Sequence, residues 1–406
     1  MTSFVFLVVG VTQLVSVEAA KRATAMREAS GLHASRLPRL TNPTEHSMVA
    51  KLQSLINPWG VVLVVLVSYL GWILVRYQGD PFSLVRIGDT VCEGYDGQFT
   101  YFIASEPTPA LAAPHLDVPA YRYQRILLPL LARLAGAGRA DWIVWALPAL
   151  NVLAQVVGTA ILEKLLVQLG VSRWYALIYG LWPGLLVAVR TDLNEPLAYA
   201  LVVVAYWADQ RSRIGWTGLL FGLALFAKET TILFVVAHGL YALTTRDPRR
   251  MWSVGGLALL PFALWQLVLW QVFGAPGLGS GGCLATPFEL IPFMGLWRIA
   301  LISLSVFGVF VLFLGPGVLL PTLWGIIAAA RRLWQGQQHP YIWAMAVNAL
   351  AIPFTPFSTF REPVAMLRYA VGLVLASLLF AGLVKSWRVL NYAWLWLALN
   401  VFLIKD

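Results

Sequence analysis

The strongest constraint on this chain is a series of apolar stretches, each long enough to cross a lipid bilayer as a helix. A membrane-spanning helix needs ~20 mostly apolar residues. Of the 406 residues, 59% are hydrophobic and 12% are charged, and that charged share is about half of the share in an ordinary soluble domain. This composition excludes a disordered chain and a soluble globular enzyme. We predict about eleven spans, near residues 58–76, 142–163, 172–189, 193–208, 214–228, 230–245, 251–273, 297–330, 341–358, 364–384 and 388–404.

The positive charge of each connection between spans predicts the side of the membrane on which it lies, because Lys and Arg accumulate on the cytoplasmic side. The segment before the first span is rich in Lys and Arg, which predicts a cytoplasmic N-terminus in a plasma or inner membrane. Residues 1–57 are expected to form a cytoplasmic leader that is either disordered or not part of the translated protein, with Met48 as the alternative start. Residues 58–404 are expected to form a single all-α polytopic domain. The net charge of +10 is interpreted as basic residues in the loops that set the orientation in the membrane, and not as a sign of nucleic-acid binding.

The longest external connection covers residues 77–137 and is rich in acidic side chains. Its last part, residues 125–137, is too short for an easy crossing and suits a helix that lies at the interface. In this topology nearly all charges outside the cytoplasmic connections gather at the external face. They come from four segments that are far apart in sequence. A polar cavity open to the outside would solvate them. Scattered helix caps are the alternative.

Asp96 lies in this external loop, in the sequence Tyr95-Asp96-Gly97-Gln98. Asp-Gly is a common turn signal, so a purely structural turn is one interpretation. Residues 99–104, however, form an amphipathic helical pattern. A carboxylate on such an aromatic-rich interfacial helix can act as a general base on a hydroxyl group.

Three further charged positions stand at the ends of predicted spans. Asp192 and Glu195 are three residues apart before an apolar run, which fits a capping box; alternatively, Glu195 lines the cavity. Lys228 separates two spans with almost no loop. It either forms a tight external turn or meets a phosphate group.

Arg361 and Arg368 are seven residues apart, which is two helical turns, so we expect them on one face of a helix. Arg368 would lie roughly 7–8 Å inside the span at 1.5 Å per residue, and a charge at that depth needs a partner. Snorkelling to the interface is one interpretation. A pair of arginines that holds a lipid phosphate is the other.

Both cysteines, Cys92 and Cys283, fall in predicted external loops. In an oxidising compartment they either form a disulfide that ties the first loop to residues 274–296 or remain free thiols. Their number alone gives no disulfide framework.

Several cofactor motifs are absent from the sequence. It contains no Walker A motif and no His/Cys cluster with zinc-ligand spacing. We therefore predict no cofactor. A divalent metal would find oxygen donors in Asp89, Glu93 and Asp96, but no metal is predicted.

Taken in order, these motifs resemble the C-type membrane glycosyltransferases, which use polyprenyl-phosphate sugars as donors. The resemblance is to the branch of the second GPI mannosyltransferase and its bacterial relatives, over residues 58–245. Tyr95-Asp96-Gly97 stands where that branch has an external aromatic-aspartate motif, often Trp-Asp. Residues 125–131 stand for its proline-containing interfacial segment. Trp182-Pro183 matches the proline that a span of that branch reaches, and residues 192–195 match the acidic start of its next helix.

The resemblance implies inverting transfer of mannose, or a similar hexose or pentose, to an acceptor hydroxyl at the extracytoplasmic face of the cell envelope. It implies that Asp96 is the general base. The donor phosphate would be held by cations, for which the candidates are Lys228, Arg361, Arg368 and Arg190. The candidate ligands for the sugar or acceptor are Glu195, Asp192, Tyr95, Gln98, Tyr121, Arg122 and Arg125. The expected partners are the bilayer, a polyprenyl-phosphate-sugar donor and a hydroxyl acceptor of unknown type, with no nucleic acid.

Two other classes of protein share many spans and intramembrane charges. A secondary transporter or lipid flippase would show inverted repeats and charges at mid-membrane depth. The sequence shows no internal symmetry, and its charges gather on one side. A non-catalytic scaffold subunit would lack the base, whereas Asp96 is present. The glycosyltransferase is therefore the preferred expectation.

Overall fold

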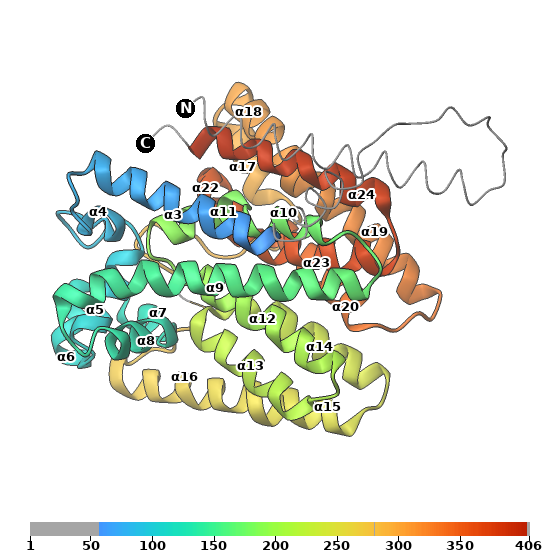
Figure 1. Ribbon diagram of the computed structural model, residues 1–406, viewed down its shortest axis with the longest axis horizontal. Helices are drawn as coiled ribbons and strands as arrows, with labels where there is room; N and C mark the ends of the chain where they lie inside the picture. Colours follow the sequence, from blue (N-terminus) through green and yellow to red (C-terminus); the bar gives the residue numbers. More distant parts are fainter. Residues whose placement is uncertain (1–56, 280, 404–406) are drawn as a thin grey trace, which may run out of the picture. The chain divides into compact units, whose positions relative to one another are not determined.

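The computed structural model describes residues 57–279 and 281–403, and the predicted leader lies outside them apart from Asn57. Helices make up most of the fold (Figure 1). Within the described residues no β-strand forms, and the only strand-like pairing is an isolated bridge between Ile87 and Gly94. The predicted all-α class is therefore confirmed.

The first part of the described chain consists of one long helix, the helices of the predicted external loop and a second long helix. These are α3 (Pro58–Arg76), α4 (Phe82–Val85), α5 (Gly97–Ser105), α6 (Pro109–Ala112), η1 (Ala113–His115), α7 (Pro119–Tyr123), α8 (Leu127–Ala135) and α9 (Ala140–Gln168). Helix α9 contacts α3, α5, α8 and α12, so it joins the loop helices to the rest of the bundle.

The middle part contains the helices that pack around α12. They are η2 (Arg173–Tyr175), α10 (Ala176–Gly180), α11 (Pro183–Arg190), α12 (Glu195–Gln210), α13 (Ile214–Ala227), η3 (Glu229–Thr231), α14 (Ile232–Thr244), α15 (Pro248–Trp252), η4 (Ser253–Leu259) and α16 (Leu260–Phe273). The predicted span at residues 172–189 is divided into η2, α10 and α11, because Pro183 starts a new helix after the extended Trp182.

The last part contains the helical stretch that continues through the Gly-Pro-Gly sequence and the helices that follow it. Its elements are α17 (Met294–Ile302), α18 (Leu304–Leu314), η5 (Gly315–Leu319), α19 (Leu320–Trp334), α20 (Pro340–Ala351), η6 (Ile352–Phe354), α21 (Phe357–Arg361), α22 (Pro363–Tyr369), α23 (Val371–Leu383), α24 (Trp387–Tyr392) and η7 (Ala393–Leu403). The sequence Gly315-Pro316-Gly317 forms a π-helical turn that connects α18 to α19.

Four helical stretches in the described residues are long and apolar enough to cross a membrane, and a fifth qualifies if a bent pair counts as one span. The four are Pro58–Arg76, Ala140–Gln168, Pro248–Phe273 and Leu304–Trp334. The fifth joins α22 to α23 across a 44° bend. These stretches are consistent with an integral membrane protein, while the count of about eleven spans stays a prediction.

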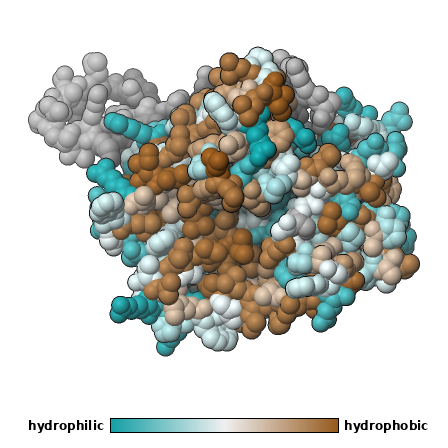
Figure 2. Space-filling model, turned by 180° about the vertical axis from the view of Figure 1, so that it is seen from behind, coloured by the Kyte–Doolittle hydropathy of each residue, from teal (hydrophilic) through white to brown (hydrophobic). Residues whose placement is uncertain are grey.

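Apolar side chains lie on the outside of several of these stretches. Val75 in α3 is 81% exposed and Leu312 in α18 is 78% exposed. Hydrophobic residues cover much of the face drawn in Figure 2. Exposed apolar area of this extent is typical of a surface that meets lipid.

Helix α23 is apolar on every side, which is typical of a fully buried helix. Every residue from Val371 to Gly382 is buried. Gly372 lies so close to α20 that an added Cβ would meet the Asn348 side-chain oxygen at 2.4 Å. The core of the bundle is therefore built around α23, and the helices of the first loop lie at the N-terminal end of α12.

Helix α8 forms inside the stretch predicted to lie at the interface. Leu128 and Ala132 are buried, whereas Leu130 and Leu134 on the other side are 42% and 77% exposed. This division matches an amphipathic helix. Its depth in a membrane stays a prediction.

Candidate functional site

Asp96 precedes helix α5 but does not cap it with its side chain. Instead, its Oδ1 atom lies 3.1 Å from Nη1 of Arg122, and its Oδ2 atom accepts a 3.0 Å hydrogen bond from Nη2 of Arg368. The carboxylate is one-third exposed, while both arginine side chains are nearly buried. A turn aspartate needs neither arginine, so the turn interpretation does not account for this side chain.

Gly97 explains why a glycine follows Asp96. A Cβ atom at this position would lie 2.2 Å from the carbonyl oxygen of Thr191, which is far inside van der Waals contact. The glycine therefore lets the start of α5 pack directly against the segment that precedes α12. This contact brings Asp96 close to Glu195 at the first turn of α12.

Glu195 is completely buried and shares one carboxylate oxygen between two cations. Its Oε1 atom accepts hydrogen bonds from Nζ of Lys228 at 2.8 Å and from Nε of Arg368 at 2.7 Å. Arg368 therefore bridges Asp96 and Glu195. Lys228 does sit in a tight turn between α13 and η3, and its side chain reaches Glu195 as well.

A second ion pair lies beside this network. Arg125 donates from Nε to Oε2 of Glu229 at 2.7 Å, and its Nη2 atom contacts both Oε1 of Glu229 and the Tyr121 hydroxyl. The guanidinium also stacks on the Tyr121 ring, 4.3 Å from its centroid. Arg125 is therefore held through its Nε and Nη2 atoms and on one face of its guanidinium.

The charges of the site balance among the described residues. Four cations, Arg122, Arg125, Lys228 and Arg368, face four carboxylates, Asp96, Asp117, Glu195 and Glu229. Burial opposes the charge on Asp96, but Arg122 and Arg368 outweigh it and hold the pKa of this carboxyl well below its usual range. Asp96 is therefore ionised in this arrangement.

A small pocket with a cavity volume of about 10 Å³, room for about one water molecule, lies over the network. Its lining combines charged, polar and apolar side chains: Asp96, Phe99, Thr100, Ile103, Arg122, Arg125, Pro129, Leu193, Asn194, Glu195 and Arg368. The lining comes from four regions that are distant in sequence, namely α5, α7–α8, the start of α12 and α22. Convergent polar groups beside apolar ones are typical of a ligand site, but such sites usually measure about 300–1,000 Å³, so a ligand larger than water requires the lining to move apart.

Two buried oxygen atoms in the lining residues have no hydrogen-bond partner. They are Oδ1 of Asn194 and Oε2 of Glu195. A buried acceptor without a donor costs roughly 1–3 kcal/mol, and both atoms belong to residues that line the pocket.

Several predicted site residues lie elsewhere. Arg361 is exposed and packs over the Phe357 ring at 5.7 Å. The prediction that it shares a helix face with Arg368 is wrong, because Glu362 is extended and Pro363 starts a new helix between them. Two arginines on one helical face therefore do not form the phosphate clamp expected from the spacing.

Arg190 and Asp192 do not line the pocket. Arg190 is buried and donates from Nη1 to the carbonyl oxygen of Ser83 at 2.9 Å, which ties α11 to the first loop. Asp192 is buried with a positive φ of 53°, and its carboxylate does not cap α12. The capping box considered for Asp192 and Glu195 therefore does not form.

Gln98 and Tyr95 have different positions. The Gln98 side chain accepts from the backbone N–H of Gly88 and donates to the Glu93 carbonyl, so its amide holds the loop together instead of facing the pocket. Tyr95 lies against the network, with Arg368 5.4 Å from its ring centroid.

Three residues of the site were missed in the sequence. Asp117 and Glu229 each pair with an arginine at two atoms, and Asn194 lines the pocket. Glu229 is adjacent to the selected Lys228, but a pairing with Arg125 at a separation of 104 residues leaves no local signal. Asp117 is five residues before Arg122, a spacing without a fixed helical meaning.

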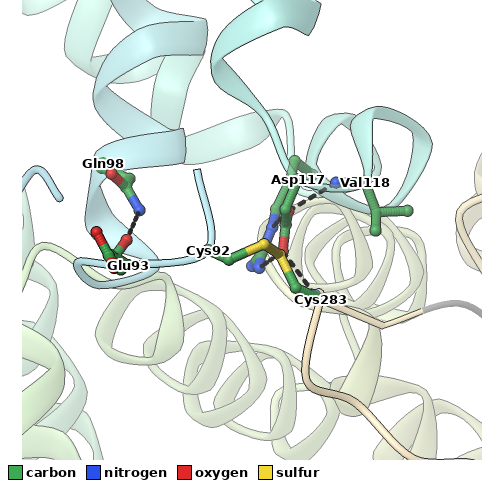
Figure 3. Close-up of a disulfide and its surroundings, with 7 residues drawn as sticks. Cys92, Glu93, Gln98, Asp117, Val118 and Cys283 are labelled. Carbon is green, nitrogen blue, oxygen red and sulfur yellow. Dashed lines mark hydrogen bonds and ion pairs between the residues drawn. A yellow bond between two sulfur atoms is a disulfide. The ribbon is translucent and has the colours of Figure 1, made fainter. Parts of the chain in front are cut away.

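A disulfide joins Cys92 to Cys283, with a Cα–Cα distance of 5.9 Å (Figure 3). It ties the first loop to the segment after α16, which is one of the two possibilities left open by the sequence. Among the described residues, no group of three or more His, Cys, Asp or Glu side chains is arranged to hold a metal ion. Asp96 is instead held by two arginines.

Comparisons with protein-family models, with curated proteins and with solved structures found no match for this chain. The functional argument therefore depends on the geometry and charge of the site.

Proposed function

We propose that this chain is an integral-membrane glycosyltransferase that moves a sugar from a polyprenyl-phosphate donor to an acceptor hydroxyl at the extracytoplasmic face. The sugar would be mannose or a similar hexose or pentose. The observation that carries the proposal is the position of Asp96: a partly exposed carboxylate at a pocket, with two arginines on its two oxygens. A base and anion-binding groups are the parts that such a transfer needs.

The arginines provide the anion-binding side of the pocket. Arg122, Arg125 and Arg368 all line it, and guanidinium groups bind phosphate oxygens through paired hydrogen bonds. Because the four cations are already balanced by four carboxylates, a donor phosphate must compete with Asp96 or Glu195 for its arginines. Binding is therefore an exchange of partners, in which Arg368 or Arg122 turns from a carboxylate to the phosphate.

This exchange has a consequence for Asp96. Once an arginine has turned to the phosphate, the Asp96 carboxylate loses part of the positive charge that keeps its pKa low. Its proton affinity rises only when the donor is bound. Asp96 then becomes a more effective base at the moment when the acceptor hydroxyl is activated.

The transfer step can be written with this geometry. The Asp96 carboxylate takes the proton from the acceptor hydroxyl while the hydroxyl oxygen forms a bond to the anomeric carbon. The bond from that carbon to the phosphate oxygen breaks, and its electron pair leaves with the polyprenyl phosphate. The arginines stabilise the negative charge that develops on the leaving group.

Two residues of the pocket lining suit the sugar. Oδ1 of Asn194 and Oε2 of Glu195 lack donors, and sugar hydroxyls would supply them. Pro129 on the amphipathic helix α8 lines the same pocket, and the far side of α8 carries exposed leucines. An apolar chain attached to the phosphate would leave the pocket along such a surface.

The test is transfer from a panel of radiolabelled polyprenyl-phosphate sugars by the purified full chain. We expect labelled product with the wild type and a loss of at least about 100-fold for Asp96→Asn, because general-base catalysis contributes about 10²–10⁴-fold. Asp89→Asn is the matched control, since Asp89 is an exposed aspartate of the same loop. Wild-type turnover by a folded Asp96→Asn protein would contradict the proposal and favour the transporter or flippase alternative.

A further inference from the structure

Asp117 holds Arg122 from the side that Asp96 does not use. Its two carboxylate oxygens accept from Nε of Arg122 at 2.7 Å and from Nη2 at 2.8 Å. Nη1 of Arg122 remains for Asp96, at 3.1 Å. The Asp117 side chain is 3% exposed, so the pair is buried and its geometry is fixed by paired hydrogen bonds.

Asp117 is itself fixed by two backbone N–H groups. Oδ1 accepts from Val118 at 2.7 Å, and Oδ2 accepts from Cys283 at 3.1 Å (Figure 3). Burial opposes the charge on Asp117, but the hydrogen bonds and charge of Arg122 hold the pKa of its carboxyl below the usual range. Asp117 is thus an ionised group with a defined partner for each oxygen.

The disulfide closes this set of contacts into a ring. Cys283 contacts Asp117, Asp117 holds Arg122, and Arg122 contacts Asp96. Cys92, four residues before Asp96, is bonded to Cys283. The ring therefore links the loop that carries Asp96 to the segment after α16.

Gly282 shows how closely this segment approaches the ion pair. A Cβ atom there would lie 2.8 Å from Nη2 of Arg122 and 2.8 Å from Oδ2 of Asp117. The backbone thus lies directly against both partners, and a Cβ atom there would have to displace one of these two side-chain ends.

We infer that Asp117 is a positioning residue that aims Arg122 at the pocket, and that the Cys92–Cys283 disulfide holds Asp117 in place for this task. The inference rests on the proposed function, because it assigns Arg122 to the donor phosphate. With Asp117 neutral, Arg122 loses the paired charged hydrogen bonds that fix its Nε and Nη2 atoms, so its Nη1 atom is no longer held toward Asp96 and the pocket. This loss of orientation is what weakens phosphate binding, although the site becomes more positive by one charge.

The experiment measures the dissociation constant of farnesyl phosphate, used as the probe, on the purified full chain. We expect Asp117→Asn to raise this constant at least about tenfold, which corresponds to about 1.4 kcal/mol. The double variant Cys92→Ser/Cys283→Ser raises it in the same direction. In a variant that combines Asp117→Asn with the two serine substitutions, we expect the dissociation constant to rise by less than the product of the two separate fold-changes. The reason is that both changes act through Arg122.

Controls separate this role from general damage. Asp141→Asn removes an exposed aspartate from the Arg139 pair and leaves the dissociation constant unchanged. The melting temperature of each variant identifies misfolding, and the double serine variant tests the inference even where Asp117→Asn is unstable.

Two results would overturn different claims. If the wild type binds farnesyl phosphate and Arg122→Gln weakens binding, but Asp117→Asn and the double serine variant do not, the positioning role is wrong and the proposed function stands. If the wild type binds no farnesyl phosphate, the proposed phosphate site is wrong, and the positioning role fails with it.

Discussion

Asp96 shows how ion pairing controls whether a carboxylate can act as a base. Arg122 and Arg368 stabilise its charged form, so in the empty site it binds a proton poorly. A catalytic base works best when its pKa is near the working pH. The proposed exchange of Arg368 or Arg122 to the donor phosphate is what resolves this conflict.

The exchange predicts a difference between two pH profiles. A base must be deprotonated, so activity falls as the pH drops through its pKa. The profile of kcat/KM reports the free protein, in which the pKa of Asp96 is held well below its ordinary value of 3.8, while kcat reports the donor complex. We therefore expect the acid limb of kcat to lie at a higher pH than that of kcat/KM, as measured by initial rates.

The exposed Asp89 provides the control for this comparison. Asp89→Asn should leave both limbs where they are in the wild type, because Asp89 lies outside the pocket lining. Coincident limbs for kcat and kcat/KM in the wild type would show that donor binding does not change the basicity of Asp96.

The sequence predicted which charged residues lie together better than it predicted how they pair. Asp96, Glu195, Lys228 and Arg368 were selected as charges on one side of the membrane, and the structure brings all four together. Their pairings are long-range: Arg368 and Asp96 are 272 residues apart. No local pattern encodes such a pairing, so Glu229 was overlooked. Asp117 was overlooked because its five-residue spacing from Arg122 has no fixed helical meaning.

At the scale of helices, the breaks between elements are what position the site. Helix α22 ends at Tyr369 and α23 begins at Val371, with a 44° bend between them. Gly184 at the start of α11 lies against this broken segment, where an added Cβ would meet the carbonyl oxygen of Leu367 at 2.2 Å. The two interrupted helices thus pack on each other and carry Arg368 to the pocket.

The sequence predicted the helices of this chain but not the points at which they are interrupted. The apolar runs at 172–189 and 364–384 were each expected to be one span, and both are divided. Proline marks a helix start at Pro183 and Pro363, but the bend at Ala370 has no proline beside it. It depends on packing between segments that are distant in sequence.

Gly97→Ala tests whether the close approach of α5 to the start of α12 builds the site. A Cβ atom 2.2 Å from the Thr191 carbonyl must push α5 away, which separates Asp96 from Arg368. We expect sugar transfer to fall at least about tenfold, with a destabilisation of about 1–3 kcal/mol from overpacking. Transfer assays and thermal unfolding of the purified protein measure both effects.

Gly71→Ala is the matched control. Gly71 lies inside α3 with nothing within 4 Å of its missing Cβ, and alanine favours a helix by about 1 kcal/mol over glycine. This variant should keep full transfer and equal or higher stability. Full transfer in Gly97→Ala would mean that this approach does not position Asp96.

For the molecule as a whole, charged clusters lie at both ends of α12. Glu195 begins the helix, and Asp209 near its end pairs with Arg250 at 3.0 Å. The two acidic residues are roughly 21 Å apart at 1.5 Å per residue. Most of the residues between them are apolar, but this separation is less than the ~30 Å hydrocarbon core of a bilayer, so α12 is too short to cross the core by itself.

The proposed sidedness predicts a labelling pattern in intact cells. Single cysteines are introduced at two exposed positions, Glu106→Cys in the first loop and Arg249→Cys in α15, in the Cys92→Ser/Cys283→Ser background. We expect a membrane-impermeant maleimide to label position 106 in intact cells and position 249 only after permeabilisation, because basic connections stay in the cytoplasm. The reverse pattern would put Asp96 on the cytoplasmic side, where the proposed transfer at the extracytoplasmic face is impossible.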